Sequence, residues 1–159
     1  FMVLKGAIKA NEKQKNKMVE KIKRTMGNLT GKTIGILGLS YKPETTDMRE
    51  APSVNIIKGL VAAGARIQIY CPEGNQEAKW RLHNEKDEIS YCHNVYEAAQ
   101  DADALVLITS WREFKGMDQE RVRTVMKDRF FFDFRNLFGD EPPRGFIYSG
   151  LGIPEREIN

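Results

Sequence analysis

Short apolar runs alternate with helix-like segments along most of the chain. From residue 33 onward, runs bounded by turn residues have the length and continuity of strands buried on both faces of a parallel sheet. They fall at residues 33–39, 66–70, 89–92, 104–108, 130–133 and 146–149. Helical patterns fill residues 52–63, 95–99 and 119–126, whereas the charged stretch 72–88 shows no clear period. This order predicts an α/β fold with a Rossmann-like, doubly wound, mostly parallel sheet.

A different pattern occupies the first 28 residues. Apolar side chains recur there at intervals that fit one face of a helix, interrupted by a polar patch at residues 11–16. We therefore expect a long helix from about residue 3 to residue 26, ended by Gly27 and Asn28. The chain divides on this basis into a helical segment, residues 1–28, and a sheet domain, residues 29–159.

Charge follows the same division. Residues 1–32 carry nine basic and two acidic side chains, so this segment has a charge of +7 within a total of +3. A basic helix can indicate contact with nucleic acid or a membrane surface. No aromatic residues lie between the lysines, and no apolar run approaches the roughly 18 residues that span a bilayer. We interpret the charge as a solvated helix face and expect neither nucleic acid nor membrane as a partner.

The rest of the composition restricts the chemistry. Cys71 and Cys92 lack metal-ligand spacing and an evident histidine partner, and the chain has only two histidines. We therefore expect no metal site and no catalytic nucleophile in these residues. Two isolated cysteines and no apolar leader segment favour the reducing cytoplasm.

Basic side chains gather where a ligand would bind such a sheet. In doubly wound folds ligands lie beyond the carboxyl ends of the strands, where the strand order reverses. Three segments follow strand ends, and each carries a cation: Lys42 and Arg49 in residues 40–52, Arg112 beside Trp111 in residues 109–116, and Arg135 in residues 134–138. Cations that converge on one crevice suit a pyrophosphate, which accepts charge-assisted hydrogen bonds.

The first strand does not continue into a dinucleotide fingerprint. Gly35 and Gly38 are present, but Leu39, Ser40, Tyr41 and Lys42 follow where further glycine is required. Cys71 occupies the end of the second strand, where an acidic residue would meet the ribose hydroxyls of NAD. Independent NAD binding is therefore not expected, and side chains such as Lys42 would have to hold the phosphates.

Three runs carry a family resemblance: GKTIGILGLSYKPETTDMREAPSVNIIKGLVAAGARIQIYCP, DADALVLITSWREF and FFDFRNLF. Together they closely resemble the C-terminal domain of the UDP-glucose/GDP-mannose dehydrogenase family, and ANEKQKNKMVEKIK looks like the end of that family's central helix. The resemblance implies an enzyme whose N-terminal domain binds NAD and whose central region provides the catalytic cysteine and dimer contacts. Two successive hydride transfers then oxidise a sugar alcohol carbon to a carboxylate.

The resemblance also assigns roles to residues. Tyr41, Lys42 and Arg135 match positions that contact the nucleotide sugar, and Arg49 matches an arginine that reaches NAD across the cleft. The motifs favour UDP-glucose or a related UDP-sugar, with an N-acetylated UDP-hexosamine and GDP-mannose as the other candidates.

Three positions depart from the family pattern. Cys71 replaces a frequent acidic residue, Ser110 a frequent glutamate, and Phe134 a common glycine before the arginine. The upstream glycine fingerprint and catalytic cysteine segment are not in these residues, so we expect part of a longer homodimeric enzyme, inactive alone. The alternative is a free-standing nucleotide-binding or interaction module whose basic helix contacts an acidic partner.

Overall fold

A single mixed sheet organises the chain. The computed structural model describes residues 2–40, 42–49 and 51–159, with the side chain of residue 11 outside the description. Within these residues seven strands lie in the order β3-β2-β1-β4-β5-β6-β7. Their bounds are β1 Thr33–Leu37, β2 Arg66–Tyr70, β3 Ile89–Tyr91, β4 Ala104–Leu107, β5 Phe130–Asp133, β6 Ile147–Gly150 and β7 Ile153–Glu157. The first six run parallel and β7 is antiparallel to β6, which confirms the predicted fold class.

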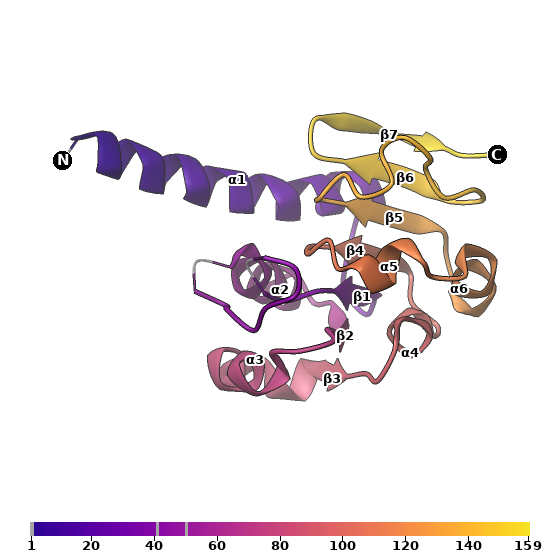
Figure 1. The fold of residues 1–159 in the computed structure, drawn as a ribbon, viewed down its shortest axis with the longest axis horizontal. Coiled ribbons are helices and arrows are strands. Elements are labelled where there is room, and N and C mark those ends of the chain that lie inside the picture. Colours follow the sequence, from indigo (N-terminus) through magenta and orange to yellow (C-terminus); the bar gives the residue numbers. More distant parts are fainter. Residues whose placement is uncertain (1, 41, 50) are drawn as a thin grey trace.

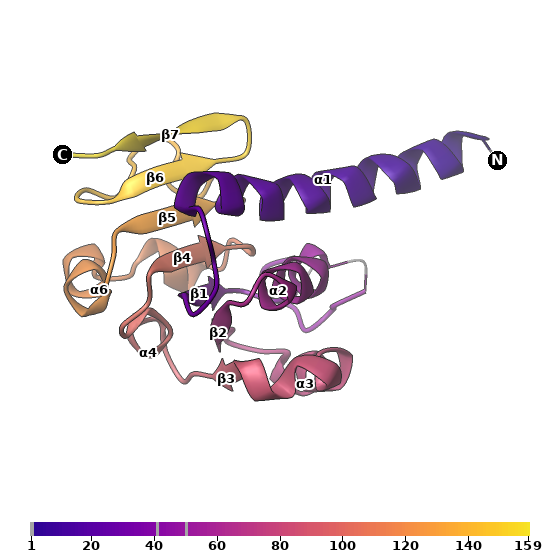
Figure 2. The same ribbon diagram turned by 180° about the vertical axis from the view of Figure 1, so that it is seen from behind.

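Helices cover both faces of the sheet. Their bounds are α1 Met2–Met26, α2 Pro52–Ala62, α3 Asn75–Arg81, α4 Val95–Ala99, α5 Arg112–Lys115 and α6 Gln119–Val125. Figures 1 and 2 show α1 and α2 on one side of the stacked strands, and α4 and α6 on the other. Gly35 allows the close approach of α4, because a Cβ atom there would lie 2.5 Å from the Ala98 carbonyl oxygen.

The stretch 72–88 corrects one sequence expectation. It is not irregular but contains α3 and a 3₁₀ helix, His83–Glu88. Helix α3 begins after Gly74, whose left-handed φ of 97° replaces a side-chain cap, and Ala78 is its only buried residue. A helix with so little buried apolar surface leaves almost no periodic signal in the sequence.

Strand β7 and helix α5 were also not predicted. β7 is an edge strand whose residues are mostly exposed, and Pro154 lies within it, a residue tolerated at sheet edges. It pairs with β6 across a short turn at residues 151–152. Such strands depend on a neighbouring strand more than on their own sequence.

Helix α1 has a packed half and a projecting half. Met18, Val19 and Ile22 are buried, and Val19 lies against Gly59 of α2. The ammonium of Lys21 donates to the carbonyl oxygens of Gly150 and Ile153, which ties α1 to the β6–β7 hairpin. Burial of this ammonium lowers the pKa of Lys21.

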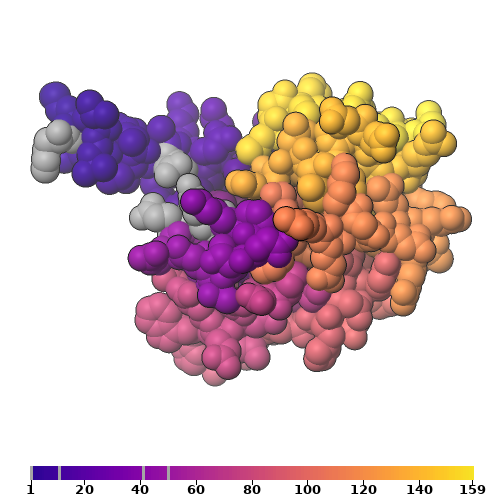
Figure 3. Space-filling view, viewed as in Figure 1, coloured from indigo at the N-terminus to yellow at the C-terminus, as the bar shows by residue number. Residues whose placement is uncertain are grey.

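The first half of α1 extends beyond the body as an arm (Figure 3). Its apolar side chains are largely exposed: Met2 by 87%, Val3 by 86%, Leu4 by 63% and Ile8 by 55%. The division of the chain at residue 28 stays a prediction. Among the helices that the structure describes, none is both long and apolar enough to cross a membrane.

Truncation of α1 side chains should separate the two halves of the helix. Ile22→Ala removes a fully buried side chain, so we expect the free energy of unfolding to fall by about 2–5 kcal/mol. Ile8→Ala, on the arm, should change it by less than about 0.5 kcal/mol in the monomeric chain. Urea unfolding followed by circular dichroism measures both, and equal losses would contradict this description of α1.

Candidate functional site

The strand order reverses between β1 and β4. From β1 the chain proceeds outward to β2 and β3, then returns to the other side of β1 as β4. The three neighbouring strands β1, β4 and β5 are parallel, so their carboxyl ends lie at the same edge of the sheet, and the segments after them all leave from there. The predicted convergence of residues 40–52, 109–116 and 134–138 at one edge is confirmed.

A seam of hydrogen bonds joins the segments that follow β1 and β4. The Ile108 amide donates to the Leu37 carbonyl at 2.9 Å, and the Thr109 hydroxyl donates to the Ser40 carbonyl at 2.8 Å. Ser53, at the start of α2, donates its hydroxyl to the Leu39 carbonyl at 2.6 Å. The hydroxyl-bearing residues of this seam are buried, so each hydroxyl satisfies a carbonyl that water cannot reach.

Gly38 makes this seam possible. Its φ is 90°, and a Cβ atom there would lie 2.5 Å from the Thr109 Cβ atom and 2.7 Å from its hydroxyl oxygen. In a dinucleotide fingerprint the glycines leave room for a pyrophosphate. Here Thr109 occupies the room beside Gly38, which does not fit independent NAD binding by this turn.

Cys71 is part of the packing at the same edge. The residue is 2% exposed, and burial raises the pKa of its thiol. A buried thiol with a raised pKa is a poor nucleophile. No carboxylate stands at this position to meet a ribose.

The segment after β1, residues 40–52, carries two exposed cations, Lys42 and Arg49. Tyr41 lies outside the described residues, so its predicted contact is not placed. Lys42 is exposed, and its carbonyl accepts the Ser40 hydroxyl at 2.8 Å. Arg112, at the start of α5, lies 4.0 Å from Glu44 of this segment, as an exposed ion pair across the seam.

Arg49 is held by its neighbour Asp47. The Arg49 Nε and Nη2 atoms donate to the two carboxylate oxygens at 3.1 Å each, and the Arg49 amide donates to Asp47 Oδ1 at 3.0 Å. The hydrogen bond from Arg49 lowers the pKa of Asp47. The arginine side chain remains 80% exposed, so the guanidinium is oriented yet open to solvent.

Helix α3 lies beside this segment. A Cβ atom on Gly74 would lie 3.8 Å from the backbone of Thr46, and Arg81 pairs with Glu77 at 2.8 Å on the same helix. The pKa of Arg49 is raised mainly by its hydrogen bond to Asp47 and more weakly by Glu77. Two acidic groups, Asp47 and Glu77, therefore act on the arginine that the family resemblance assigns to NAD.

Arg135 stands on a tightly anchored turn after β5. Phe134 and Phe138 are buried on either side of it, while Arg135 and Asn136 are exposed. Asp133 accepts the Arg135 amide at 3.2 Å. Phe134, which replaces a common glycine, contributes its ring to the core beside Phe132, with centroids 6.2 Å apart.

The segment after β4, residues 109–116, contributes large buried side chains to the packing of the domain. Trp111 is 5% exposed, and its indole nitrogen finds no hydrogen-bond partner in the described part of the chain. Tyr70 donates its hydroxyl to Glu113 at 2.5 Å, and burial together with this carboxylate raises the pKa of Tyr70. Of the predicted β4 candidates, only Arg112 is exposed to solvent.

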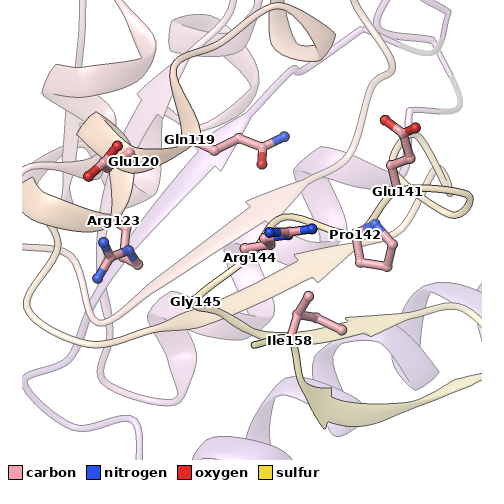
Figure 4. Close-up of a pocket in the computed structure, with 8 residues that line it drawn as sticks. All are labelled: Gln119, Glu120, Arg123, Glu141, Pro142, Arg144, Gly145 and Ile158. Carbon is pink, nitrogen blue, oxygen red and sulfur yellow. The ribbon is translucent and has the colours of Figure 1, made fainter.

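A cavity lies away from these candidate residues. Its volume is about 750 Å³, and it opens between α6 and the segment 141–145, closed on one side by Ile158 after β7. Figure 4 shows Gln119 and Arg144 extending into this space and Glu141 at its rim. Lys42, Arg49 and Arg135, the predicted site residues that the structure describes, do not line it. Within the described residues, no group of three His, Cys, Asp or Glu side chains could hold a metal ion.

The sequence alone did not reveal the residues that fix the backbone of the segments that carry the cations. The Ser40–Thr109 contact joins positions 69 residues apart, and Asp133 and Tyr148 meet across two strands. No local spacing reveals such pairs. For Asp47 the sequence does hold a signal, because an aspartate side chain readily hydrogen-bonds to the backbone two residues on in a local turn.

Comparison with known proteins shows which protein family the chain matches. Residues 35–140 match the model of the UDP-glucose/GDP-mannose dehydrogenase family, UDP binding domain. The chain is 38% identical over 156 residues to UDP-glucose 6-dehydrogenase TuaD of Bacillus subtilis (strain 168), covering 97% of this chain and 33% of that protein. UDP-glucose 6-dehydrogenase of Rhizobium meliloti (strain 1021) is 36% identical, with 96% and 35% covered. The chain thus spans about a third of the length of these relatives.

Solved structures agree on the fold. A UDP-glucose dehydrogenase from the archaeon Pyrobaculum islandicum superimposes with a TM-score of 0.75 at 22% identity, covering 94% of this chain and 32% of that chain. A GDP-mannose dehydrogenase from Pseudomonas aeruginosa gives a TM-score of 0.62 at 21% identity, with 94% and 34% covered.

Substitution of Gly38 should show how much the close packing of Gly38 against Thr109 contributes to stability. Gly38→Ala combines a left-handed backbone with overlap against Thr109, so we expect a loss of about 2–4 kcal/mol in unfolding free energy. Gly31→Ala is the matched control, because Gly31 has a φ of 75° and open space around its Cβ position. It should cost only about 1–2 kcal/mol. Equal losses in chemical unfolding would mean that the Thr109 contact contributes nothing.

Proposed function

The chain belongs to the UDP-glucose/GDP-mannose dehydrogenase family, and we propose that it binds the nucleotide sugar of an NAD-dependent oxidoreductase. The ligand is UDP-glucose or a related UDP-sugar, since the most similar sequences reported above are named UDP-glucose 6-dehydrogenases. The whole enzyme would oxidise UDP-glucose to UDP-glucuronate in two hydride transfers, with residues outside this chain supplying the catalytic cysteine.

One observation carries the proposal: exposed cations stand on segments that leave the carboxyl ends of the strands, where the strand order reverses. Lys42 follows β1 and Arg135 follows β5, and both lie within the residues that match the UDP binding domain. A pyrophosphate presents several anionic oxygens, which Lys42 meets as a point charge and Arg135 as a planar, bidentate donor. Tyr41 is proposed as a further contact to the nucleotide sugar.

Arg49 is proposed to face NAD. NAD, when bound, accepts the hydride, and the missing fingerprint puts its main binding site on residues outside this chain. The bidentate contact with Asp47 orients the guanidinium while its side chain stays exposed. Such an oriented donor loses little conformational entropy on meeting an anion.

The arm of α1 is proposed to pack against a second copy of the chain. Leu4 and Ile8, four residues apart on the helix, are both exposed and share one face that a homodimer would bury. Cys71 and Cys92 are both free thiols, which supports a cytoplasmic location.

Titration of the chain with UDP tests the binding proposal. We expect saturable heat of binding with UDP, and Arg135→Ala should weaken the affinity by about one to two orders of magnitude, the effect of one lost charge-assisted hydrogen bond. Arg66→Ala is the control. Arg66 is exposed at the first position of β2, so it lies at the amino ends of the strands, away from the proposed site at their carboxyl ends. Absence of UDP binding, or an equal loss in the control, would refute the site.

Steady-state kinetics of the longer enzyme would separate the cations. Lys42→Ala and Arg135→Ala should mainly raise KM for the nucleotide sugar, whereas Arg49→Ala should mainly raise KM for NAD. Each change is expected to be about tenfold to a hundredfold. If Arg49→Ala affected only the nucleotide sugar, its assignment to NAD would be wrong.

A further inference from the structure

Asp133 is a fully buried carboxylate at the end of β5. Its exposed fraction is 0%. Oδ1 accepts the amides of Arg135 at 3.2 Å and Leu137 at 3.1 Å. Oδ2 accepts the Phe138 amide at 2.9 Å and the Tyr148 hydroxyl at 2.6 Å. Burying a carboxylate is unfavourable unless donors replace its water, and four donors do so here.

Three of these donors are backbone amides of one turn. The carboxylate therefore fixes the path of residues 135–138 directly, and Tyr148 fixes the carboxylate from the neighbouring strand β6. Asn136 has a left-handed φ of 53°, a conformation that needs such support. From the other side, the Lys115 ammonium of α5 donates to the Leu137 carbonyl at 2.9 Å.

This anchoring leaves Arg135 as the cation presented by the turn. Because Phe134 and Phe138 are buried on its two sides, the turn has little freedom to rotate. A guanidinium on an ordered backbone meets its ligand at a smaller entropic cost than one on a mobile loop.

We propose that Asp133, held by Tyr148, is a positioning residue for nucleotide-sugar recognition, acting through Arg135. It touches no ligand; its role is to fix the backbone from which Arg135 extends. This inference rests on the proposed function, because it takes Arg135 as a ligand of the UDP-sugar. The competing interpretation is that Asp133 contributes to folding stability alone.

A double-mutant cycle read by calorimetric titration with UDP distinguishes these interpretations. Asp133→Asn replaces one carboxylate oxygen by an NH₂ group, which cannot accept hydrogen bonds from the amides of the turn. We expect it to weaken UDP binding about tenfold when Arg135 is present and less than about twofold in the Arg135→Ala background, because coupled residues are not additive. Additive losses in the two backgrounds would overturn the proposal.

Asp103→Asn is the matched control for stability. Asp103 is 4% exposed and accepts the Thr33 amide at 2.9 Å. Unlike Asp133, it lies at the amino ends of the strands, where β1 and β4 begin. We expect this variant to lower the Tm while leaving the Kd for UDP within about twofold, since the two edges share no partners. A Kd change equal to that of Asp133→Asn would support the stability interpretation instead.

Tyr148→Phe provides a milder variant should Asp133→Asn fail to fold. It removes one of the four donors and should weaken UDP binding about threefold, again only when Arg135 is present. Amide hydrogen exchange gives a readout without ligand: exchange at residues 135, 137 and 138 should accelerate about tenfold in either variant relative to Asp103→Asn, because opening of the turn becomes easier. Unchanged exchange would refute the anchoring. Failure of the unsubstituted chain to bind UDP, with accelerated exchange, would refute the proposed function while retaining the anchor.

Discussion

The contact between Gly38 and Thr109 is the constraint on which the rest of the site depends. It lets the segments after β1 and β4 pack against each other where the strand order reverses, with the Thr109 hydroxyl bonded to the Ser40 carbonyl. Doubly wound sheets open a crevice at this place by default. Here Thr109 packs against Gly38 at this place, and the cations stand on the segments that follow β1, β4 and β5.

In the proposed function, this arrangement lets a Rossmann-like unit bind an anion without a glycine fingerprint. In the fingerprint, backbone amides approach the phosphates and side chains must be small. In this chain Thr109 fills the space beside Gly38, so the proposed function gives the recognition of phosphate to exposed side chains. Long side chains lose more conformational freedom on binding than backbone amides do. That difference makes the residues that restrain them as important as the cations themselves.

Two aspartates provide such restraint by different means. Asp47 is itself half-exposed and orients the Arg49 guanidinium directly, through a bidentate pair. Asp133 is fully buried and restrains Arg135 through the backbone of its turn. The buried carboxylate avoids solvent screening, whereas the exposed pair is weakened by salt.

The sequence by itself determined the fold class, most strand positions and the edge at which the cations gather. Continuous apolar runs such as residues 104–107 identify buried parallel strands, and the carboxyl ends of those strands follow from their direction. It did not determine α3 or β7, whose own residues bury little and whose conformation depends on neighbours. Only the tertiary structure decided that Thr109 fills the glycine turn, that Trp111 is buried, and that Asp133 and Tyr148 anchor Arg135. The physical reason is common to all three: they depend on contacts or burial produced when distant strands come together, which local periodicity does not encode.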